Sequence, residues 1–227
     1  MSIRLTRPLR AYALAAVVLG LGAATILPSE VEARTLRGGG SMSLGELRGE
    51  LVEIGVPVPT GATIARGVSR LAEEAERKRT RFPVAGEFNW GQSGARFGAG
   101  RSGHVHEGQD VFAPTGTPLL SVADGVVLET GDDGGRGNYV AIFDPAARRT
   151  YFYLHMVEPS RVPAGRRVRA GQPVGGVGCT GSCFGEHLHF EVRRGRDTAG
   201  PAEDPLPLLR RWADLAGAGP TLPPGKS

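Results

Sequence analysis

Residues 179–192 read CTGSCFGEHLHFEV, and this stretch decides how the rest of the chain is interpreted. Side chains alternate between the two faces of a β-strand, so residues two apart point the same way. A strand here places His187, His189 and Glu191 on one face. The other face collects three apolar side chains: Leu188, Phe190 and Val192. The apolar face can bury against a core, while the first face presents two imidazoles side by side.

A lone His-x-His pair occurs by chance, so its meaning depends on companions elsewhere in the chain. The sequence has five histidines, and four of them fall into three short motifs. His106 and Asp110 form an H-x3-D motif, and His155 ends the aromatic run at residues 151–154. The fifth, His104, lies two residues before His106.

Length and composition favour one mainly β domain with accessory segments. The chain has 227 residues, of which 35 are Gly and 17 are Pro, and this favours short strands and tight turns over long helices. The hydrophobic fraction of 40% is compatible with a packed core. The formal net charge is +4 with no dense basic stripe, so nothing here indicates nucleic-acid binding.

The N-terminus has the pattern of an export signal. Arg4, Arg7 and Arg10 precede an apolar run at residues 11–27, and small residues flank Glu32 before a cleavage point after residue 33. The apolar run is about as long as the shortest membrane-spanning helices, roughly 17 residues, so an uncleaved membrane anchor is the alternative. Both interpretations place the rest of the chain outside the cytoplasm, in the cell envelope, the periplasm or the extracellular space.

The chain has two cysteines, Cys179 and Cys183. In an exported chain the first interpretation is a disulfide, which closes a very short loop just before His187. Chain-entropy arithmetic gives such a ring about 2 kcal/mol, so we expect its main purpose to be holding the loop that leads into the His-x-His strand. The alternatives are two free, buried thiols or a pair of metal ligands. The second is weaker because His and Asp companions already suffice.

Residues 34–81 read as a linker followed by helices. Gly38–Gly40 is a flexible stretch, and leucine and isoleucine recur at helical spacing over residues 43–54. Residues 63–81 form a second helical pattern, with Ile64, Val68 and Leu71 on one stripe. This segment would be a helical hairpin, a spacer or a cover over an active groove, and a solvated stalk explains it equally well.

From residue 82 to about residue 200 the pattern changes to short β-rich runs between Gly and Pro turns. Turn signals at residues 123–125 and 144–147 are each flanked by two such runs. Residues 201–227 hold one short helix, at 206–215, and a Pro/Gly end that we expect to be disordered.

Catalytic zinc usually takes three protein ligands and leaves a fourth position to water. His106, Asp110 and His189 would make such a set, and a long sequence gap is normal when ligands come from different strands. Gly108 argues against a helix between the first two, so the H-x3-D motif is expected in a strand-and-turn arrangement.

His155 and His187 then remain beside the metal. Zinc lowers the pKa of its bound water to around 7, a neutral imidazole nearby can take that proton, and an imidazolium can steady an oxyanion. Two histidines outside a His2Asp set suit amide hydrolysis better than a structural site, which would use all its positions on metal.

Seven short motifs occur in order between residues 103 and 193. They are GHVHEGQD (103–110), APTGTP (113–118), ADGVV (123–127), GNYV (137–140), YLH (153–155), VRAGQ (168–172) and GEHLHFEVR (185–193). Any one of them is a weak signal, but all of them in this order are highly specific. By these motifs residues 82–193, about half of the chain, resemble the lysostaphin-type zinc endopeptidases, which cut peptide bonds in bacterial peptidoglycan.

The resemblance implies roles for five residues of this sequence. His106, Asp110 and His189 resemble the ligands of one zinc ion, and His155 and His187 resemble the catalytic histidines. It also implies a small, mainly antiparallel β domain with a narrow groove over the metal. The family often has Ser or Thr where this chain has its two cysteines, so the expected disulfide is a departure that bears on loop mobility alone.

Other polar residues near these motifs have simpler interpretations. His104 is expected to be a solvated or outer neighbour of the site. Glu107 and Glu186 sit beside site residues, but the matched pattern gives neither of them the role of a base. Asp124 is expected in a turn, and Asn138 either lines the groove or forms a turn.

The sequence therefore predicts an exported zinc-dependent endopeptidase that hydrolyses peptide cross-links of bacterial peptidoglycan. Its partners would be peptide stems or cross-bridges, and residues 11–27 would supply any membrane tether. One alternative is a non-enzymatic wall-binding regulator of other peptidoglycan hydrolases, although all five site positions are kept. Another is a structural envelope protein whose helices between residues 43 and 81 recruit partners. Nothing in the sequence predicts an oligomeric state.

Overall fold

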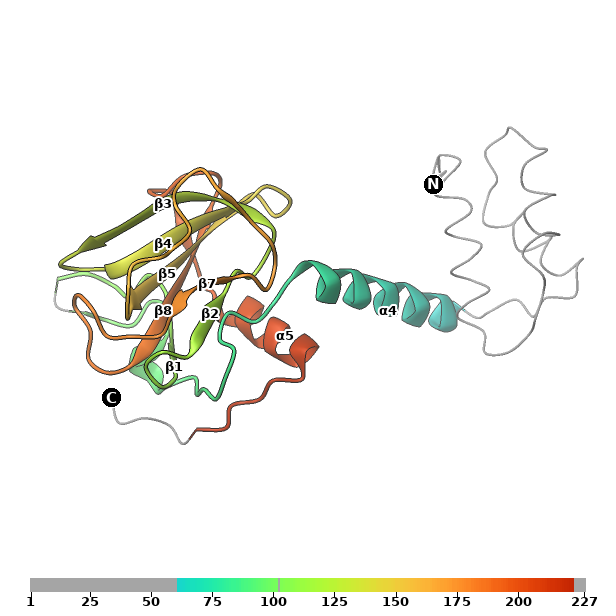
Figure 1. Ribbon diagram of the computed structural model, residues 1–227. Coiled ribbons are helices and arrows are strands. Elements are labelled where there is room, and N and C mark those ends of the chain that lie inside the picture. The colour runs from blue at the N-terminus through green and yellow to red at the C-terminus, as the bar shows by residue number, and fades with distance from the viewer. Residues whose placement is uncertain (1–60, 102, 223–227) are drawn as a thin grey trace, which may run out of the picture. The chain divides into compact units, whose positions relative to one another are not determined.

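The structure is a computed structural model that describes residues 61–101 and 103–222 (Figure 1). The chain divides into two compact units, Met1–Ala75 and Glu76–Ser227. The predicted export signal at residues 1–33 and the predicted helix at residues 43–54 lie outside the described residues. Among the residues described, no helix has both the length and the apolar composition needed to cross a membrane.

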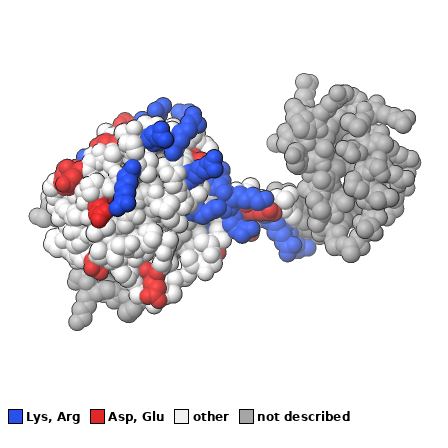
Figure 2. Space-filling model, viewed as in Figure 1, with Lys and Arg blue, Asp and Glu red and all other residues white. Residues whose placement is uncertain are grey.

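Helix α4 (Gly61–Arg79) corresponds to the helix predicted over residues 63–81. Its last turn carries Arg77, Lys78 and Arg79, whose positive charges stabilise the negative C-terminal end of the helix dipole. Figure 2 shows basic side chains gathered near this end, whereas acidic and basic residues are otherwise scattered among uncharged ones. Leu71, from the predicted apolar stripe, is 49% exposed, so the stripe is not buried at that position.

Most strands of the second unit join one antiparallel sheet of seven strands. These are β1 (Gln109–Phe112), β3 (Gly125–Asp133), β4 (Gly137–Asp144), β5 (Arg149–Met156), β6 (Arg167–Val168), β8 (His187–Arg194) and β9 (Ala202–Glu203). Their order is β1-β8-β5-β4-β3-β6, and β9 also pairs with β8. A second sheet pairs β2 (Pro118–Leu120) with β7 (Pro173–Gly176), and a single 3-10 turn, η1, covers Ser93–Ala95. The predicted fold class, mainly β and antiparallel, is confirmed.

The two turn signals have different outcomes. Residues 144–147 join β4 to β5, which pair directly as an antiparallel hairpin. Residues 123–125 lie between β2 and β3, but these strands belong to different sheets and do not pair. A turn signal is local and therefore does not tell which strand becomes the partner.

The large sheet buries apolar side chains on both faces. One face contributes to the main core, in which Leu188, Phe190 and Val192 are fully buried, as their alternation in β8 predicts. The other face carries a smaller cluster of four buried residues: Tyr139, Ala141, Phe152 and Leu154. Because β8 directs its histidines to that second face, the small cluster forms a buried apolar surface beside them.

Helix α5 (Leu206–Ala216), predicted at residues 206–215, packs on the main core. Trp212 is buried, with its ring 5.8 Å from that of Tyr151 and 6.3 Å from that of Phe190. The chain after residue 200 therefore adds to the same core as the sheet, and only residues 223–227 of the predicted tail lie beyond the described residues.

Candidate metal centre

Pairing of β1 with β8 brings the two halves of the site together. In this register Asp110 lies directly opposite His189, and opposite residues of an antiparallel pair project from the same face. His106 precedes β1 in an irregular segment, as the glycine in the H-x3-D motif predicts. Gly108 is required there because a Cβ atom at this position would lie 2.6 Å from Nε2 of His189.

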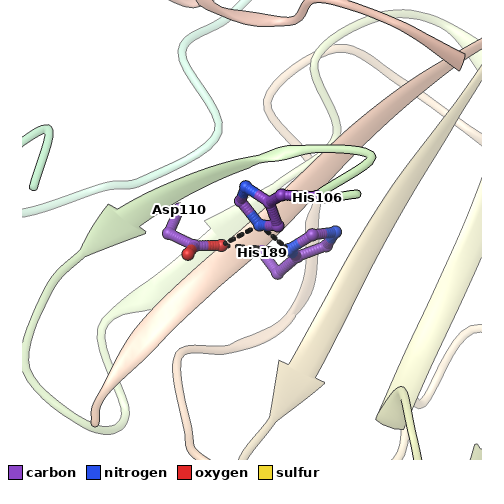
Figure 3. A group of neighbouring side chains, drawn as sticks. All are labelled: His106, Asp110 and His189. Atoms are coloured by element: carbon purple, nitrogen blue, oxygen red, sulfur yellow. Dashed lines mark hydrogen bonds and ion pairs between the residues drawn. The ribbon is translucent and has the colours of Figure 1, made fainter. Parts of the chain in front are cut away.

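Three donor atoms meet at the centre of the site (Figure 3). The distance from His106 Nε2 to Asp110 Oδ1 is 2.9 Å, and His189 Nδ1 lies 2.9 Å from each of these atoms. All three residues are buried. Within the described part of the chain, this is the group of His, Cys, Asp and Glu side chains arranged closely enough to hold a metal ion.

The outer nitrogens of both rings settle which atoms face the centre. His106 Nδ1 lies 2.8 Å from the carbonyl oxygen of Arg96, and His189 Nε2 lies 3.1 Å from Oε1 of Glu191. Since a carbonyl or carboxylate oxygen can only accept, each outer nitrogen carries a proton, and the inner nitrogen of each ring is the atom that can offer a lone pair to an ion. When both rings are neutral, two nitrogen lone pairs and a carboxylate oxygen point at one centre, so the donor set fits a small cation such as zinc.

The charges around the cluster also favour a cation. Burial by itself raises the pKa of Asp110, but hydrogen bonds with His106 and His189 hold it well below its ordinary range. Burial lowers the pKa of His189, yet its hydrogen bonds with Asp110 and Glu191 outweigh this and raise it to about 9. The histidines thus favour the ionised form of Asp110, while Asp110 and Glu191 favour positive charge at His189, and a bound cation would supply that positive charge.

An outer layer of charged residues holds His189 in place. Arg193 donates from Nε to Glu191 Oε2 at 2.8 Å and from Nη2 to Glu107 Oε2 at 2.7 Å. Glu107 is thus committed to Arg193, and Glu186 accepts a hydrogen bond from Thr115 at 2.7 Å. Both carboxylates thus have side-chain partners, and that neither serves as a base stays a prediction.

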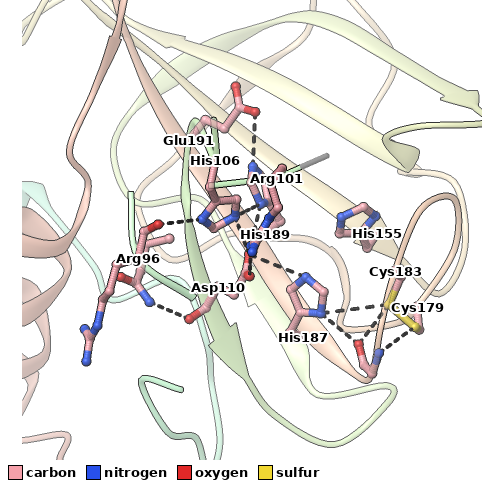
Figure 4. A network of polar contacts seen from close by, with 12 residues as sticks. Arg96, Arg101, His106, Asp110, His155, Cys179, Cys183, His187, His189 and Glu191 are labelled. Carbon is pink, nitrogen blue, oxygen red and sulfur yellow. Dashed lines mark hydrogen bonds and ion pairs between the residues drawn. A yellow bond between two sulfur atoms is a disulfide. The ribbon is translucent and has the colours of Figure 1, made fainter. Parts of the chain in front are cut away.

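His155 and His187 lie beside the cluster (Figure 4). Their ring centroids are 5.0 Å apart, and Nε2 of His187 lies 3.5 Å from Oδ1 of Asp110. His155 Nδ1 donates to the carbonyl of Thr180 at 2.8 Å, and His187 Nδ1 donates to that of Gly185 at 2.7 Å. Both rings therefore carry their lone pair on Nε2.

Burial lowers the pKa of both rings. The pKa of His155 falls to about 4, first through burial and then through the neighbouring charge of His187. Burial also lowers the pKa of His187, against the opposing pull of Asp110. Both imidazoles are thus neutral at neutral pH, the form that can accept a proton.

The backbone turns His155 toward the site against simple alternation. Leu154 points to the site face of β5, so a regular strand would direct His155 to the main core. Instead His155 has φ of 60°, beside an irregularity in the β4–β5 register between Asn138 and Val140. Such strained backbone conformations cluster at functional sites.

The donor cluster and both further imidazoles line one groove of about 510 Å³. Its rim carries two exposed apolar side chains, Phe184 at 96% exposure and Val105 at 56%. His104 and Arg101 also line it, and Arg101 Nη2 lies 3.4 Å from the second carboxylate oxygen of Asp110. His104 lies outside the donor cluster.

The predicted disulfide between Cys179 and Cys183 is present, with their Cα atoms 5.3 Å apart. Neither sulfur belongs to the donor cluster, so the interpretation of these residues as metal ligands or as free thiols is wrong.

Residues 104–201 match the model of peptidase family M23. The chain is 34% identical over 112 residues to the glycyl-glycine endopeptidase ALE-1 of Staphylococcus capitis, which covers 49% of this chain and 31% of that protein. It is 40% identical over 103 residues to the DD-carboxypeptidase/endopeptidase Mpg of Neisseria meningitidis serogroup B, covering 45% and 23%. The chain thus spans less than a third of the length of either relative.

Among solved structures, the antimicrobial peptidase lysostaphin from Staphylococcus simulans superposes with a TM-score of 0.51 at 26% identity. This match covers 64% of the present chain and 59% of lysostaphin. Peptidases of the matched family depend on zinc, for which imidazole nitrogen and carboxylate oxygen are suitable ligands. The match places a peptidase M23 domain of the lysostaphin type at residues 104–201.

Proposed function

We propose that this chain is an exported zinc-dependent endopeptidase that hydrolyses peptide cross-links of bacterial peptidoglycan. The observation that carries the proposal is the content of one groove, where two further imidazoles lie beside a three-donor cluster. In a structural metal site the neighbouring histidines would also bind the ion, whereas a hydrolytic site needs proton acceptors outside the cluster.

His106 Nε2, Asp110 Oδ1 and His189 Nδ1 would hold the ion. When bound, zinc supplies a Lewis acid for the scissile carbonyl and lowers the pKa of water to about 7. The chain's own part is to turn the inner nitrogen of each ring toward the ion. Arg96 does this for His106 through its carbonyl, and Glu191 does it for His189.

His155 and His187 would share the proton transfers. Each is neutral, with its lone pair on Nε2, so each can accept a proton from the attacking water. The carbon–oxygen bond forms as this proton leaves the water, and the carbon–nitrogen bond breaks as a proton reaches the departing amine. The imidazolium that exists between these events can stabilise the oxyanion.

The names of the relatives support peptidoglycan as the substrate. One is described as a glycyl-glycine endopeptidase and another, ShyC of Vibrio cholerae, as a peptidoglycan DD-endopeptidase. Glycine bridges and cross-links between D-amino acids are both peptide bonds with little side-chain bulk, and both suit a narrow groove. The proposed substrate class is therefore the peptide part of peptidoglycan.

Two features support export. Residues 1–33 have the composition of a signal peptide, with the membrane anchor at residues 11–27 as the alternative. The disulfide between Cys179 and Cys183 would persist in an oxidising compartment such as the periplasm or the extracellular space.

The test is an incubation of the purified chain, starting at residue 34, with intact peptidoglycan in zinc and in chelator. Mass spectrometry of the released fragments identifies the bond that is cut. We expect fragments with a cleaved cross-link in zinc and none in chelator. Tight zinc binding without any cleavage would overturn the enzymatic proposal and favour the non-enzymatic regulator.

A further inference from the structure

We propose that the loop closed by the Cys179–Cys183 disulfide, together with the two residues that follow it, is a positioning element for both imidazoles beside the metal cluster. It acts through two backbone carbonyls, that of Thr180 inside the loop and that of Gly185 just after it. The inference rests on the proposed function, because it assigns a role in turnover to a segment that contacts neither the ion nor its ligands. It explains why a five-residue ring stands at this point of the chain.

The first carbonyl belongs to Thr180, inside the disulfide ring. It accepts the Nδ1 proton of His155 at 2.8 Å. The Thr180 hydroxyl accepts from the backbone N–H of Asn138 and donates to the carbonyl of Met156, both at 2.9 Å. Thr180 is therefore anchored on both strands of the irregularity that turns His155 toward the groove.

The ring is also fastened to the turn between β3 and β4. The Ser182 N–H donates to the carbonyl of Gly135 at 3.0 Å. Gly137 faces the ring so closely that a Cβ atom there would lie 2.3 Å from Oγ1 of Thr180. The loop cannot shift toward this turn, so the carbonyl of Thr180 has a fixed position.

The second carbonyl belongs to Gly185, two residues beyond the ring, and accepts the Nδ1 proton of His187 at 2.7 Å. The Gly185 N–H points back to Sγ of Cys179 at 3.3 Å. Sγ of Cys183 lies 3.8 Å from Nδ1 of His187 (Figure 4). The two sulfurs thus contact Gly185 and the imidazole of His187 that Gly185 orients.

The consequence is a division of labour within the groove. The ligands His106 and His189 are oriented by Arg96 and Glu191, which belong to other parts of the chain. His155 is oriented by the carbonyl of Thr180 inside the disulfide ring, and His187 by the carbonyl of Gly185, whose N–H contacts Sγ of Cys179. Opening the disulfide should therefore disturb His155 and His187 and leave the metal ligands His106 and His189 in place.

The experiment compares four variants of the chain from residue 34: Cys179→Ser with Cys183→Ser, Thr180→Val, Thr180→Ser and Thr150→Val. Thr180→Val removes both anchoring hydrogen bonds, and Thr180→Ser keeps the hydroxyl. Thr150→Val is the matched control, because the Thr150 hydroxyl also bonds a backbone carbonyl, that of Gly195 at 2.8 Å, at the other end of β5.

We expect kcat for peptidoglycan fragments to fall about 10- to 100-fold in the double-serine variant and in Thr180→Val, as when other supports of active-site groups are removed. KM and the zinc affinity should stay within about twofold of the parent chain. Thr180→Ser and Thr150→Val should keep the parent kcat. A zinc affinity that falls together with kcat, or a kcat that does not fall, would overturn the proposal.

Nitrogen-15 NMR of the imidazoles supplies a readout that needs no turnover. In the parent chain His155 and His187 should both show the Nδ1–H tautomer, and in the double-serine variant each should become a mixture of tautomers. If the parent chain cleaves nothing, the proposed function fails while this comparison still decides the positioning role. Unchanged tautomers in a folded double-serine variant would refute it.

Discussion

His187 and His189 lie two residues apart on one face of β8, yet they contact different groups. Nδ1 of His189 lies 2.9 Å from both other donor atoms of the cluster. Nδ1 of His187 is bound to a carbonyl, and its Nε2 is 3.5 Å from Asp110. The two histidines should therefore fail in different ways when removed.

We expect His189→Ala to lose both zinc and cleavage, because a two-donor site holds the ion poorly. His187→Ala should keep zinc and lose about 100- to 10,000-fold in kcat, the range of a general acid or base. Zinc per chain is measured by mass spectrometry of the metal, and cleavage by release of peptidoglycan fragments. His104→Ala, outside the donor cluster, is the histidine control for zinc content. Full cleavage in either of the first two variants would contradict the assignment.

Phe184 is 96% exposed at the rim of the groove, so its aromatic ring is not part of the core. We expect it to cover bound substrate, so Phe184→Ala should raise KM about three- to tenfold, roughly 1 kcal/mol, with kcat and the melting temperature unchanged. Steady-state kinetics on a soluble cross-linked fragment measures this. Val157→Ala, an exposed apolar residue outside the groove lining, is the control. An unchanged KM in Phe184→Ala would show that the ring does not touch substrate.

The sequence predicted which three side chains lie together in the donor cluster, because donor atoms belong to side chains whose identities can be read, and their role as metal ligands stays a proposal. The orienting groups were harder to find. Arg96, Thr180 and Gly185 act through backbone carbonyls, which any residue carries, so no residue type signals them. Glu191 did leave a signal, since alternation in β8 places it on the face of His189.

At the scale of elements, short strand β9 is attached by charge. Glu203 accepts from Arg149 at 2.8 Å and from Arg194 at 2.8 and 2.9 Å. Hydrogen bonds with Arg194, and to a smaller extent with Arg149, lower the pKa of Glu203. A carboxylate with a lowered pKa in the folded state adds stability above its unfolded pKa, and that stability is lost as the pH falls through the folded value.

We therefore expect Glu203→Gln to reduce the free energy of unfolding by about 1 kcal/mol at pH 7, since these pairs are partly exposed. The difference from the parent chain should shrink as the pH falls below about 4.5. Urea unfolding of both chains in chelator at several pH values measures it. Glu158→Gln, whose pair with Arg161 is largely exposed, should change little. A Glu203→Gln deficit that does not shrink between pH 7 and pH 3 would contradict this account.

Elements with strong local patterns were predicted correctly from the sequence, but the strands with which they pair were not always predicted. The apolar alternation of β8, the β4–β5 hairpin and helix α5 all follow from local residues. The pairing of β2 with β7 depends on contacts between residues more than fifty positions apart, which a turn signal cannot encode. The φ of 60° at His155 is likewise set by its surroundings.

At the scale of the whole molecule, the second unit begins at Glu76, before the residue at which the sequence pattern changes. Glu76 pairs with Arg211 of α5 at 2.6 Å, and the Arg81 N–H donates to the carbonyl of Val122 at 2.8 Å. Arg79 also lies 3.6 Å from the buried carboxylate of Asp144. The last turn of α4 thus supplies contacts to the second unit.

A chain that starts at Glu76 should therefore be more stable than one that starts at Phe82. We expect a difference of about 1–2 kcal/mol in the free energy of unfolding, from two ion pairs and the backbone contacts. Thermal and urea unfolding of the two purified fragments, each with zinc, measure it. Equal stability would mean that the α4 residues add nothing to the second unit.

The pairing of β1 with β8 also determines when the metal can be taken up. His106 and His189 are 83 positions apart, and β1 is joined to the sheet through β8. Contacts so distant in sequence form slowly, because the intervening chain must first be ordered. The full donor set is therefore completed only when β1 pairs with β8, and the rate of tight zinc uptake should report this pairing.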